Sequence, residues 1–137
     1  MNTVKKISTL TGLPSDTIRY YTKIGLLIPD RHPHNKYKIY TNHDIKLLEF
    51  IKLAKSLGFS LEEIQNIINE GKNNRSPCQR VRNSVEKRIA ETRQKLKELS
   101  VFQERLEKAL YKWNSMPDLV PQGDSFCHLI ESVSDAD

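Results

Sequence analysis

The sequence predicts a mainly α-helical protein, in which a small helical head carrying a short β-hairpin precedes one long helix. Three observations support this prediction. Two short helical patterns separated by a glycine stand near the N-terminus, a proline-containing segment with alternating residues follows them, and an apolar seven-residue repeat fills much of the second half. The chain has 137 residues, of which 37% are hydrophobic and 28% charged. These values suit one small domain with an extension.

The first two helices form a helix-turn-helix pattern. A first helix is expected over Val4–Thr11, with Thr3 as N-cap and Gly12 as its break. A second helix is expected over Pro14–Ile24, because proline is tolerated in the first turn, and Gly25 ends it. Helix, glycine-containing turn and helix in this order are typical of DNA-binding heads.

The segment "LLIPDRHPHNKYKIYT" predicts a small hairpin, or wing. We expect short strands over Leu26–Ile28 and Tyr37–Tyr40, because the second run alternates and the two prolines interrupt what lies between. The expected tip is polar and basic. It contains Arg31, His32, His34, Asn35 and Lys36.

Two further helices complete the predicted head. The third opens at Asn42 or Asp44 and ends at Gly58. The fourth starts after Ser60, which forms a capping box with Glu63. The polar stretch "EGKNNRSP" then predicts a turn and a boundary, which gives domains over residues 1–75, 76–114 and 115–137.

A long helix is expected from Cys78 to about Asn114, with one narrow apolar seam. Such a stripe cannot bury itself, so a second copy of the chain is the simplest partner. The alternative is an intramolecular hairpin, but the remaining chain offers no second long stripe. A proline-rich loop, "SMPDLVPQGD", and a closing turn capped by Ser125 are expected after it. The seam residues are Val85, Ile89, Thr92, Leu96, Leu99, Gln103, Leu106, Leu110 and Trp113.

Charge is unevenly distributed along the chain. Residues 1–75 hold 12 Lys and Arg against 7 Asp and Glu, whereas residues 76–137 hold 10 of each. A basic head joined to a neutral extension indicates a polyanionic partner, although a solvated lysine-rich surface is an alternative. No apolar run is long enough for a membrane helix, and the N-terminus lacks a signal-peptide pattern, so we expect a cytosolic protein. No nucleotide-binding or catalytic motif is present, and we expect no enzymatic activity.

The second expected helix carries the residue types that contact DNA. Arg19 can bind a phosphate or a guanine edge, and Tyr20 can donate to a phosphate. Ser15, Thr17 and Lys23 add donors on or beside the same helix. The alternative is that the tyrosines are core-edge aromatics and the arginine is merely solvated, but the basic wing that follows favours DNA contact.

Three motifs in order, "TIRYYTKIGLL", "NKYKIYTNHDI" and "FIKLAKSLGFSLEEI", resemble the MerR family of bacterial transcription regulators over nearly the whole chain. The resemblance implies a winged helix-turn-helix head and an antiparallel coiled-coil homodimer on a two-fold symmetric promoter operator. It also implies that effector binding bends and untwists the promoter so that RNA polymerase can engage it. The residues that it assigns to DNA contact are Arg19, Tyr20 and Tyr21 on the reading helix and Tyr37 and Lys38 on the wing, beside the basic tip residue Arg31.

The sequence also departs from the family pattern in the head. The family often has an acidic residue where Thr22 stands, glycine where Lys36 stands and arginine where Lys38 stands. Lysine lacks the bidentate geometry of arginine, so details of the phosphate contact are expected to differ.

The resemblance further suggests a divalent metal as effector. In an antiparallel dimer, Cys78 of one subunit approaches Cys127 of the other, and "CHLIE" resembles the closing segment of the family's metal sensors. With His128 these residues suit Zn²⁺, Cd²⁺, Pb²⁺ or Hg²⁺. The usual loop cysteine is missing, so Asp118, Asp124 or water are other candidates for the third ligand.

Two alternatives to metal sensing stay open at this point. The same fold can act as a thiol-based redox or electrophile sensor through Cys78, which stands at the start of the long helix near Arg80 and Arg82. A coiled-coil adaptor whose basic head binds a protein or RNA is the second alternative.

Overall fold

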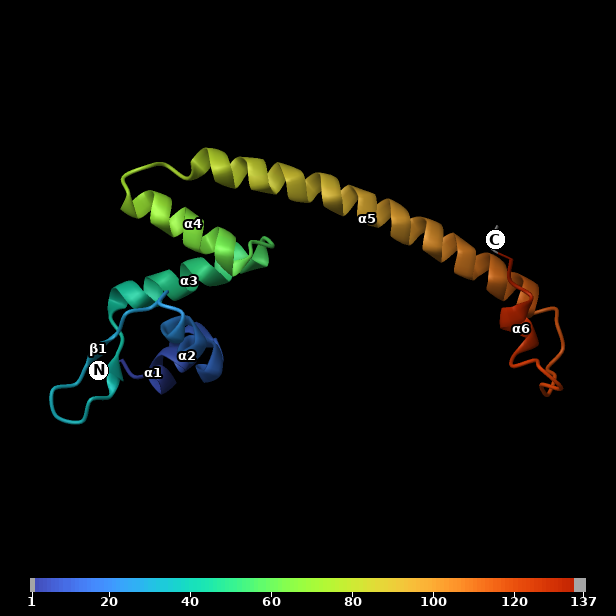
Figure 1. Ribbon diagram of the computed structural model, residues 1–137, viewed down its shortest axis with the longest axis horizontal. Helices are drawn as coiled ribbons and strands as arrows, with labels where there is room; N and C mark the ends of the chain where they lie inside the picture. Colours follow the sequence, from blue (N-terminus) through green and yellow to red (C-terminus); the bar gives the residue numbers. More distant parts are fainter. Residues whose placement is uncertain (1, 135–137) are drawn as a thin grey trace. The chain divides into compact units, whose positions relative to one another are not determined.

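The computed structural model describes residues 2–134 and is mainly helical (Figure 1). It divides into two compact units, one ending at Val85 and the other beginning at Glu86. The elements are α1 (Val4–Thr11), α2 (Ser15–Lys23), β1 (Asp30–Arg31), β2 (Lys38–Ile39), α3 (Asn42–Ser56), α4 (Leu61–Lys72), α5 (Cys78–Trp113) and α6 (His128–Glu131).

The helix-turn-helix pattern is confirmed at α1 and α2. The Thr3 hydroxyl accepts the backbone N–H of Lys6, which caps α1 as expected. Gly12 has φ of 76° and donates its N–H to the Ser8 carbonyl at 2.9 Å, so the turn uses a left-handed residue that glycine tolerates well.

The first wing strand lies further along the chain than the sequence suggested. The prediction over Leu26–Ile28 is wrong, because β1 is Asp30–Arg31 and pairs antiparallel with β2. The N–H groups of Leu26 and Leu27 both donate to the Tyr21 carbonyl, so this stretch closes the end of α2. Leu27 is buried in the core, and only after Pro29 is the backbone free to pair across the hairpin.

The capping box predicted for α4 is confirmed, and α3 has a capping box that the sequence did not indicate. Ser60 and Glu63 form a complete capping box at α4, and Thr41 and Asp44 form one at α3. The N-cap of α3 is therefore Thr41, one residue before the expected start. Helix α4 continues to Lys72, so part of the expected polar turn is helical.

The core of the head is a single apolar cluster drawn from α1 to α4 and the wing. A polar contact supports it, because Lys52 Nζ donates to the Thr11 carbonyl at 2.6 Å and so joins α3 to the end of α1. The largest fully buried side chains are Ile7, Ile18, Leu27, Tyr40, Leu48, Ile51 and Ile64.

The start of the long helix packs with the head. Val81 and Val85 lie against the core cluster, and Arg80 forms an ion pair with Glu70 of α4. The first compact unit therefore extends to Val85, ten residues beyond the boundary expected from composition. The functional division at residues 75 and 114 stays a prediction.

The remainder of α5 presents its apolar seam unburied. Leu99 is 63% exposed, and Ile89, Leu96, Leu106 and Leu110 are exposed as well. Phe102 and Val101 add exposed apolar area beside the seam, which the spacing alone did not indicate. None of the helices described between residues 2 and 134 combines the length and hydropathy that a bilayer span needs.

The chain closes with one helical turn, α6, held against the end of α5. Lys112 Nζ donates to the Ser132 carbonyl at 3.0 Å. The prediction that Ser125 caps this turn is wrong, because Cys127 is its N-cap residue and makes no side-chain capping bond. The Ser125 hydroxyl instead donates to Glu131 at 2.6 Å.

Candidate functional site

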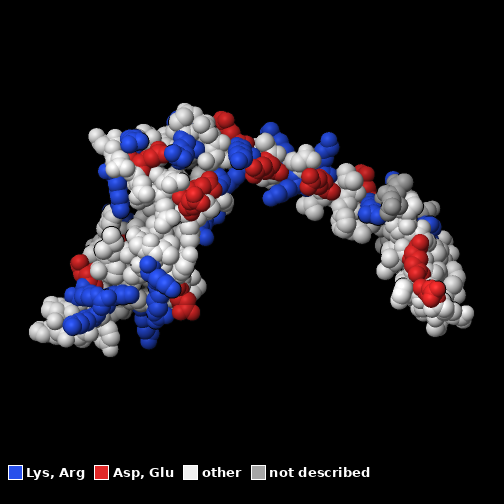
Figure 2. All heavy atoms as spheres, viewed as in Figure 1, with Lys and Arg blue, Asp and Glu red and all other residues white. Residues whose placement is uncertain are grey.

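A surface groove in the head brings the reading helix and the wing together. Arg19 of α2 shares it with Arg31, Tyr37 and Lys38 of the hairpin, four residues that the sequence singled out. In the view of Figure 2, Lys and Arg side chains gather at the end of the head where Figure 1 draws the hairpin. The other lining residues are Thr3, Val4, Lys5 and Lys36.

The groove lining is strongly cationic. Two arginines and three lysines line it, and no carboxylate does. Such a concentration of positive charge attracts the phosphates of a nucleic acid over several ångströms. Lys5 was missed by the sequence analysis, because an isolated lysine on the first helix carries no signal until the fold places it beside the wing.

Arg19, which lines this groove, also forms a local ion pair. Its guanidinium lies 3.0 Å from Asp16 Oδ1, one helical turn earlier, and both side chains are largely exposed. An exposed pair of this kind contributes little to stability, so the arginine can exchange the carboxylate for a phosphate.

The two tyrosines of the reading helix point in different directions. Tyr20 is 51% exposed, whereas Tyr21 is 4% exposed and belongs to the core. Burial, and secondarily the neighbouring Tyr20, raises the pKa of Tyr21. This placement argues against direct DNA contact by the Tyr21 side chain and favours a supporting role beneath the helix. Ser15 and Thr17 are half-buried near the start of α2, and Lys23 is exposed at its end; none of the three lines the groove.

The wing tip is shaped by its own side chains. His32 Nδ1 accepts the backbone N–H of His34 at 3.2 Å, and Asn35 Oδ1 accepts that of Tyr37 at 3.0 Å. Lys36 has φ of 58°, a conformation that glycine adopts most easily. The family often has glycine at this position, which suits such a conformation, and Lys36 instead places a cation at the tip of the hairpin.

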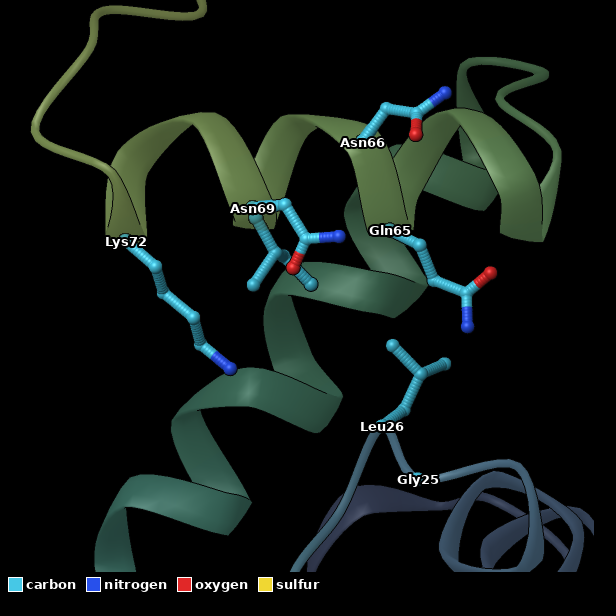
Figure 3. Close-up of a pocket in the computed structure, with 7 residues that line it drawn as sticks. Gly25, Leu26, Gln65, Asn66, Asn69 and Lys72 are labelled. Carbon is cyan, nitrogen blue, oxygen red and sulfur yellow. The ribbon is translucent and has the colours of Figure 1, made fainter.

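A second pocket in the head, drawn in Figure 3, lies between α4 and the turn after α2. Side chains rich in amides project from α4, and Gly25 and Leu26 close the opposite side. None of the residues predicted to bind DNA lines it. Its lining is Gly25, Leu26, Gln65, Asn66, Ile68, Asn69 and Lys72.

The expected metal ligands belong to different compact units. Cys78 is an exposed free thiol at the start of α5, and Cys127 is a half-buried free thiol at the start of α6. Within residues 2–134 of one chain, no three His, Cys, Asp or Glu side chains lie close enough to hold a metal.

His128 is fixed in one ring orientation. Its Nε2 lies 2.8 Å from the Pro117 carbonyl oxygen, which can only accept, so Nε2 carries the proton. In the neutral ring Nδ1 then keeps its lone pair. A metal-binding histidine usually donates its other N–H to a carbonyl in this way. The same ring lines a loop pocket with Asp118, Gln122 and Ser125.

Glu131 closes the loop that carries Cys127. Its carboxylate accepts the Ser125 hydroxyl at 2.6 Å and the Phe126 N–H at 3.1 Å. These hydrogen bonds, the one from Ser125 first, lower the pKa of the Glu131 carboxyl. The sequence alone does not indicate this role of Glu131, because its partners are set by the path of the loop.

Comparison with known proteins agrees with this architecture. Residues 3–71 match the family described as "MerR HTH family regulatory protein", and residues 45–109 match that described as "MerR, DNA binding". The chain is 31% identical over 134 residues to the HTH-type transcriptional regulator HmrR of Rhizobium leguminosarum bv. viciae, covering 96% of this chain and 97% of the relative.

Two further similarities concern proteins whose names mention metals. The chain is 37% identical over 68 residues to the Heavy metal-dependent transcription regulator 1 of Rhizobium meliloti, covering 50% of this chain and 46% of that one. The fold resembles the transcription regulator PbrR691 of Ralstonia metallidurans in complex with lead(II), with a TM-score of 0.73 at 21% identity. That match covers 98% of this chain and 100% of the other.

Proposed function

Because the chain belongs to the MerR family of transcription regulators, we propose that it binds promoter DNA as a homodimer and alters the DNA in response to a divalent metal ion. The observation that carries this proposal is the basic groove shared by α2 and the wing. The family consists of transcription regulators, which agrees with the expected absence of enzymatic activity. A promoter-binding regulator acts in the bacterial cytoplasm, and RNA polymerase is then a further partner.

The DNA contact that we propose divides between the two sides of the groove. Arg19 reads a base edge or clamps a phosphate from α2, while Arg31, Tyr37 and Lys38 hold the neighbouring backbone from the wing. Ser15, Thr17, Tyr20 and Lys23 supply further donors along the helix. The exposed seam of α5 pairs with a second copy in antiparallel orientation, which sets two heads on a two-fold symmetric operator.

Metal response is supported by the chemistry of the available donors. Both thiols are free, and the protonation of His128 leaves Nδ1 able to coordinate. In the antiparallel dimer Cys127 and His128 of one subunit meet the partner subunit's Cys78, a set of two thiolates and one imidazole. Such a set suits Zn²⁺, Cd²⁺, Pb²⁺ or Hg²⁺. The bound ion would supply a cross-link between the subunits.

The energetic requirement on the effector is modest. Bending and untwisting a promoter costs a few kcal/mol, about 1 to 6 by elastic estimates. The effector must therefore favour the distorting dimer over the relaxed one by a comparable difference in binding free energy.

DNA binding is tested by titrating the purified protein against a palindromic duplex obtained by selection, at several salt concentrations. Arg19→Ala should cost about 1 to 3 kcal/mol of binding free energy, and binding should weaken steeply with salt. Unchanged affinity would contradict the groove assignment. Salt-independent binding, or preference for RNA, would favour the adaptor alternative.

A thiol-based redox or electrophile sensor is the second candidate, because Cys78 is exposed and unpaired. Metal stoichiometry per dimer separates the two. One or two ions per dimer, lost in Cys78→Ser and in Cys127→Ser, support metal sensing. A metal-free dimer whose promoter response follows alkylation of Cys78 supports the alternative.

A further inference from the structure

Glu131 forms hydrogen bonds with Cys127 itself and with the two residues that precede it. Its backbone N–H donates to the Cys127 carbonyl at 3.0 Å. Its carboxylate reaches back to the two residues before the cysteine, accepting from Ser125 at 2.6 Å and Phe126 at 3.1 Å. The cysteine, in extended conformation, is thus held in a small ring closed by one side chain.

We propose that Glu131 is a positioning residue that orients Cys127 for metal coordination, an inference that rests on the proposed function. Each oxygen of the carboxylate accepts one hydrogen bond from the loop, so both are directed at the segment before Cys127. Glu131 acts through the backbone that presents the thiol.

The segment from Ser125 to Ser132, which contains these hydrogen bonds, is also attached to α5. Lys112 Nζ of α5 holds the carbonyl of Ser132, the residue after Glu131. His128, next to the cysteine, is held by the Pro117 carbonyl. The backbone on both sides of Cys127 is therefore held by hydrogen bonds. A metal ligand that is ordered before binding loses less conformational entropy when the ion binds.

This part of the loop, between α5 and Cys127, is largely exposed to solvent. The backbone N–H of Ser125 donates to the Gln122 carbonyl at 3.1 Å. Removing the carboxylate should therefore release the segment before Cys127 while leaving α5 unaffected.

The test compares Glu131→Gln with Glu104→Gln in the full-length protein. Both changes remove one negative charge, but Glu104 lies on the exposed surface of α5, outside the seam and the loop. Glutamine keeps one acceptor oxygen for these hydrogen bonds, so Glu131→Ala gives the larger effect. Cd²⁺ is the probe, because its affinity follows from chelator competition and its thiolate bonds absorb in the ultraviolet.

We expect Glu131→Gln to weaken Cd²⁺ binding about 10-fold, the lower range for residues that orient metal ligands. Glu104→Gln should bind as the wild type does. A second readout needs no metal. In the Cys78→Ser background, Glu131→Gln should speed alkylation of Cys127. The midpoint of unfolding, followed by helical circular dichroism, should stay the same.

The outcomes separate the two proposals. Wild-type affinity and an unchanged alkylation rate in Glu131→Gln overturn the positioning role and leave metal sensing intact. Absence of Cd²⁺ binding by the wild type overturns metal sensing, and the alkylation rates then decide whether Glu131 orders Cys127.

Discussion

The hydroxyl oxygens of Tyr40 and Thr22 lie 2.8 Å apart and join the end of the wing to the reading helix. Thr22 Oγ1 also donates to the Ile18 carbonyl at 2.9 Å, so its hydrogen is committed and Tyr40 must be the donor. Tyr40 is 1% exposed. The chain thus uses a neutral hydrogen bond where the family pattern often has an acidic residue, and the contact sets the orientation of the wing relative to α2.

Thr22→Val should destabilise the head more than Tyr40→Phe does. The valine leaves the buried Tyr40 hydroxyl without an acceptor, which costs about 1 to 3 kcal/mol. The phenylalanine removes that hydroxyl itself, so no buried donor is left unpaired and the cost is about 1 kcal/mol. Urea unfolding followed by circular dichroism measures both.

The double variant provides the control for this pair. Because both changes act on one hydrogen bond, Thr22→Val with Tyr40→Phe should cost less than the sum of the single changes. Strict additivity would show that the two hydroxyls do not interact in solution.

Much of the head could be predicted from local sequence signals. The caps at Thr3 and Ser60 and the break at Gly12 are read directly, because each acts on backbone groups within four residues. The first wing strand could not be placed this way. Leu26 and Leu27 belong to a short apolar run that resembles a buried strand, but their N–H groups donate to the Tyr21 carbonyl and cannot pair across the hairpin.

The candidate sites divide along the same line. Arg19, Tyr37 and Lys38 were found because charge and aromatic character are visible in sequence, yet only the fold showed that they share a groove with Lys5. The different orientations of Tyr20 and Tyr21 could be predicted only in part. Adjacent residues of a helix differ in direction by about 100°, but which of the two side chains is buried depends on the neighbouring elements. Glu131 escaped notice because its partners lie across a loop.

Tyr20→Phe should weaken operator binding, and Tyr21→Phe should not. The exposed hydroxyl of Tyr20 is free to reach a phosphate, and its loss should cost about 1 kcal/mol per subunit. Fluorescence anisotropy with a labelled duplex measures the difference. Equal losses in the two variants would place the Tyr21 hydroxyl at the DNA after all.

Stability should fall above pH 10 in a manner that depends on Tyr21. Its pKa is raised in the folded protein, so the unfolded chain releases this proton at lower pH and ionisation favours unfolding. The stability difference between wild type and Tyr21→Phe should be constant below about pH 10, the ordinary tyrosine value, and shift in favour of the variant above it. Parallel curves through pH 11 would contradict this.

Leu99→Asp should convert the dimer to monomers. The side chain lies mid-seam and is 63% exposed in the single chain, so an aspartate there places a charge at the expected interface. Because the dimer is two-fold symmetric, the substitution occurs twice in the interface. We expect the free energy of dimerisation to weaken by roughly 4 kcal/mol or more, which raises the dissociation constant about 1,000-fold. Sedimentation equilibrium measures it. Tyr111→Asp, at an exposed position beside the seam, is the control and should remain dimeric.

His128→Gln should change metal preference rather than abolish metal binding. With the imidazole gone, Cys127 and the partner subunit's Cys78 remain. Two thiolates satisfy linear Hg²⁺, whereas Zn²⁺ prefers four ligands and loses the single nitrogen donor of the proposed set. We therefore expect at least a 10-fold loss in Zn²⁺ affinity, in the range known for disturbed metal sites, with Hg²⁺ binding little altered. Competition titration with each ion measures both, and His43→Gln, on an exposed residue of the head, is the matched control. Unchanged Zn²⁺ affinity would remove His128 from the ligand set and leave Asp118 or Asp124 as the candidates.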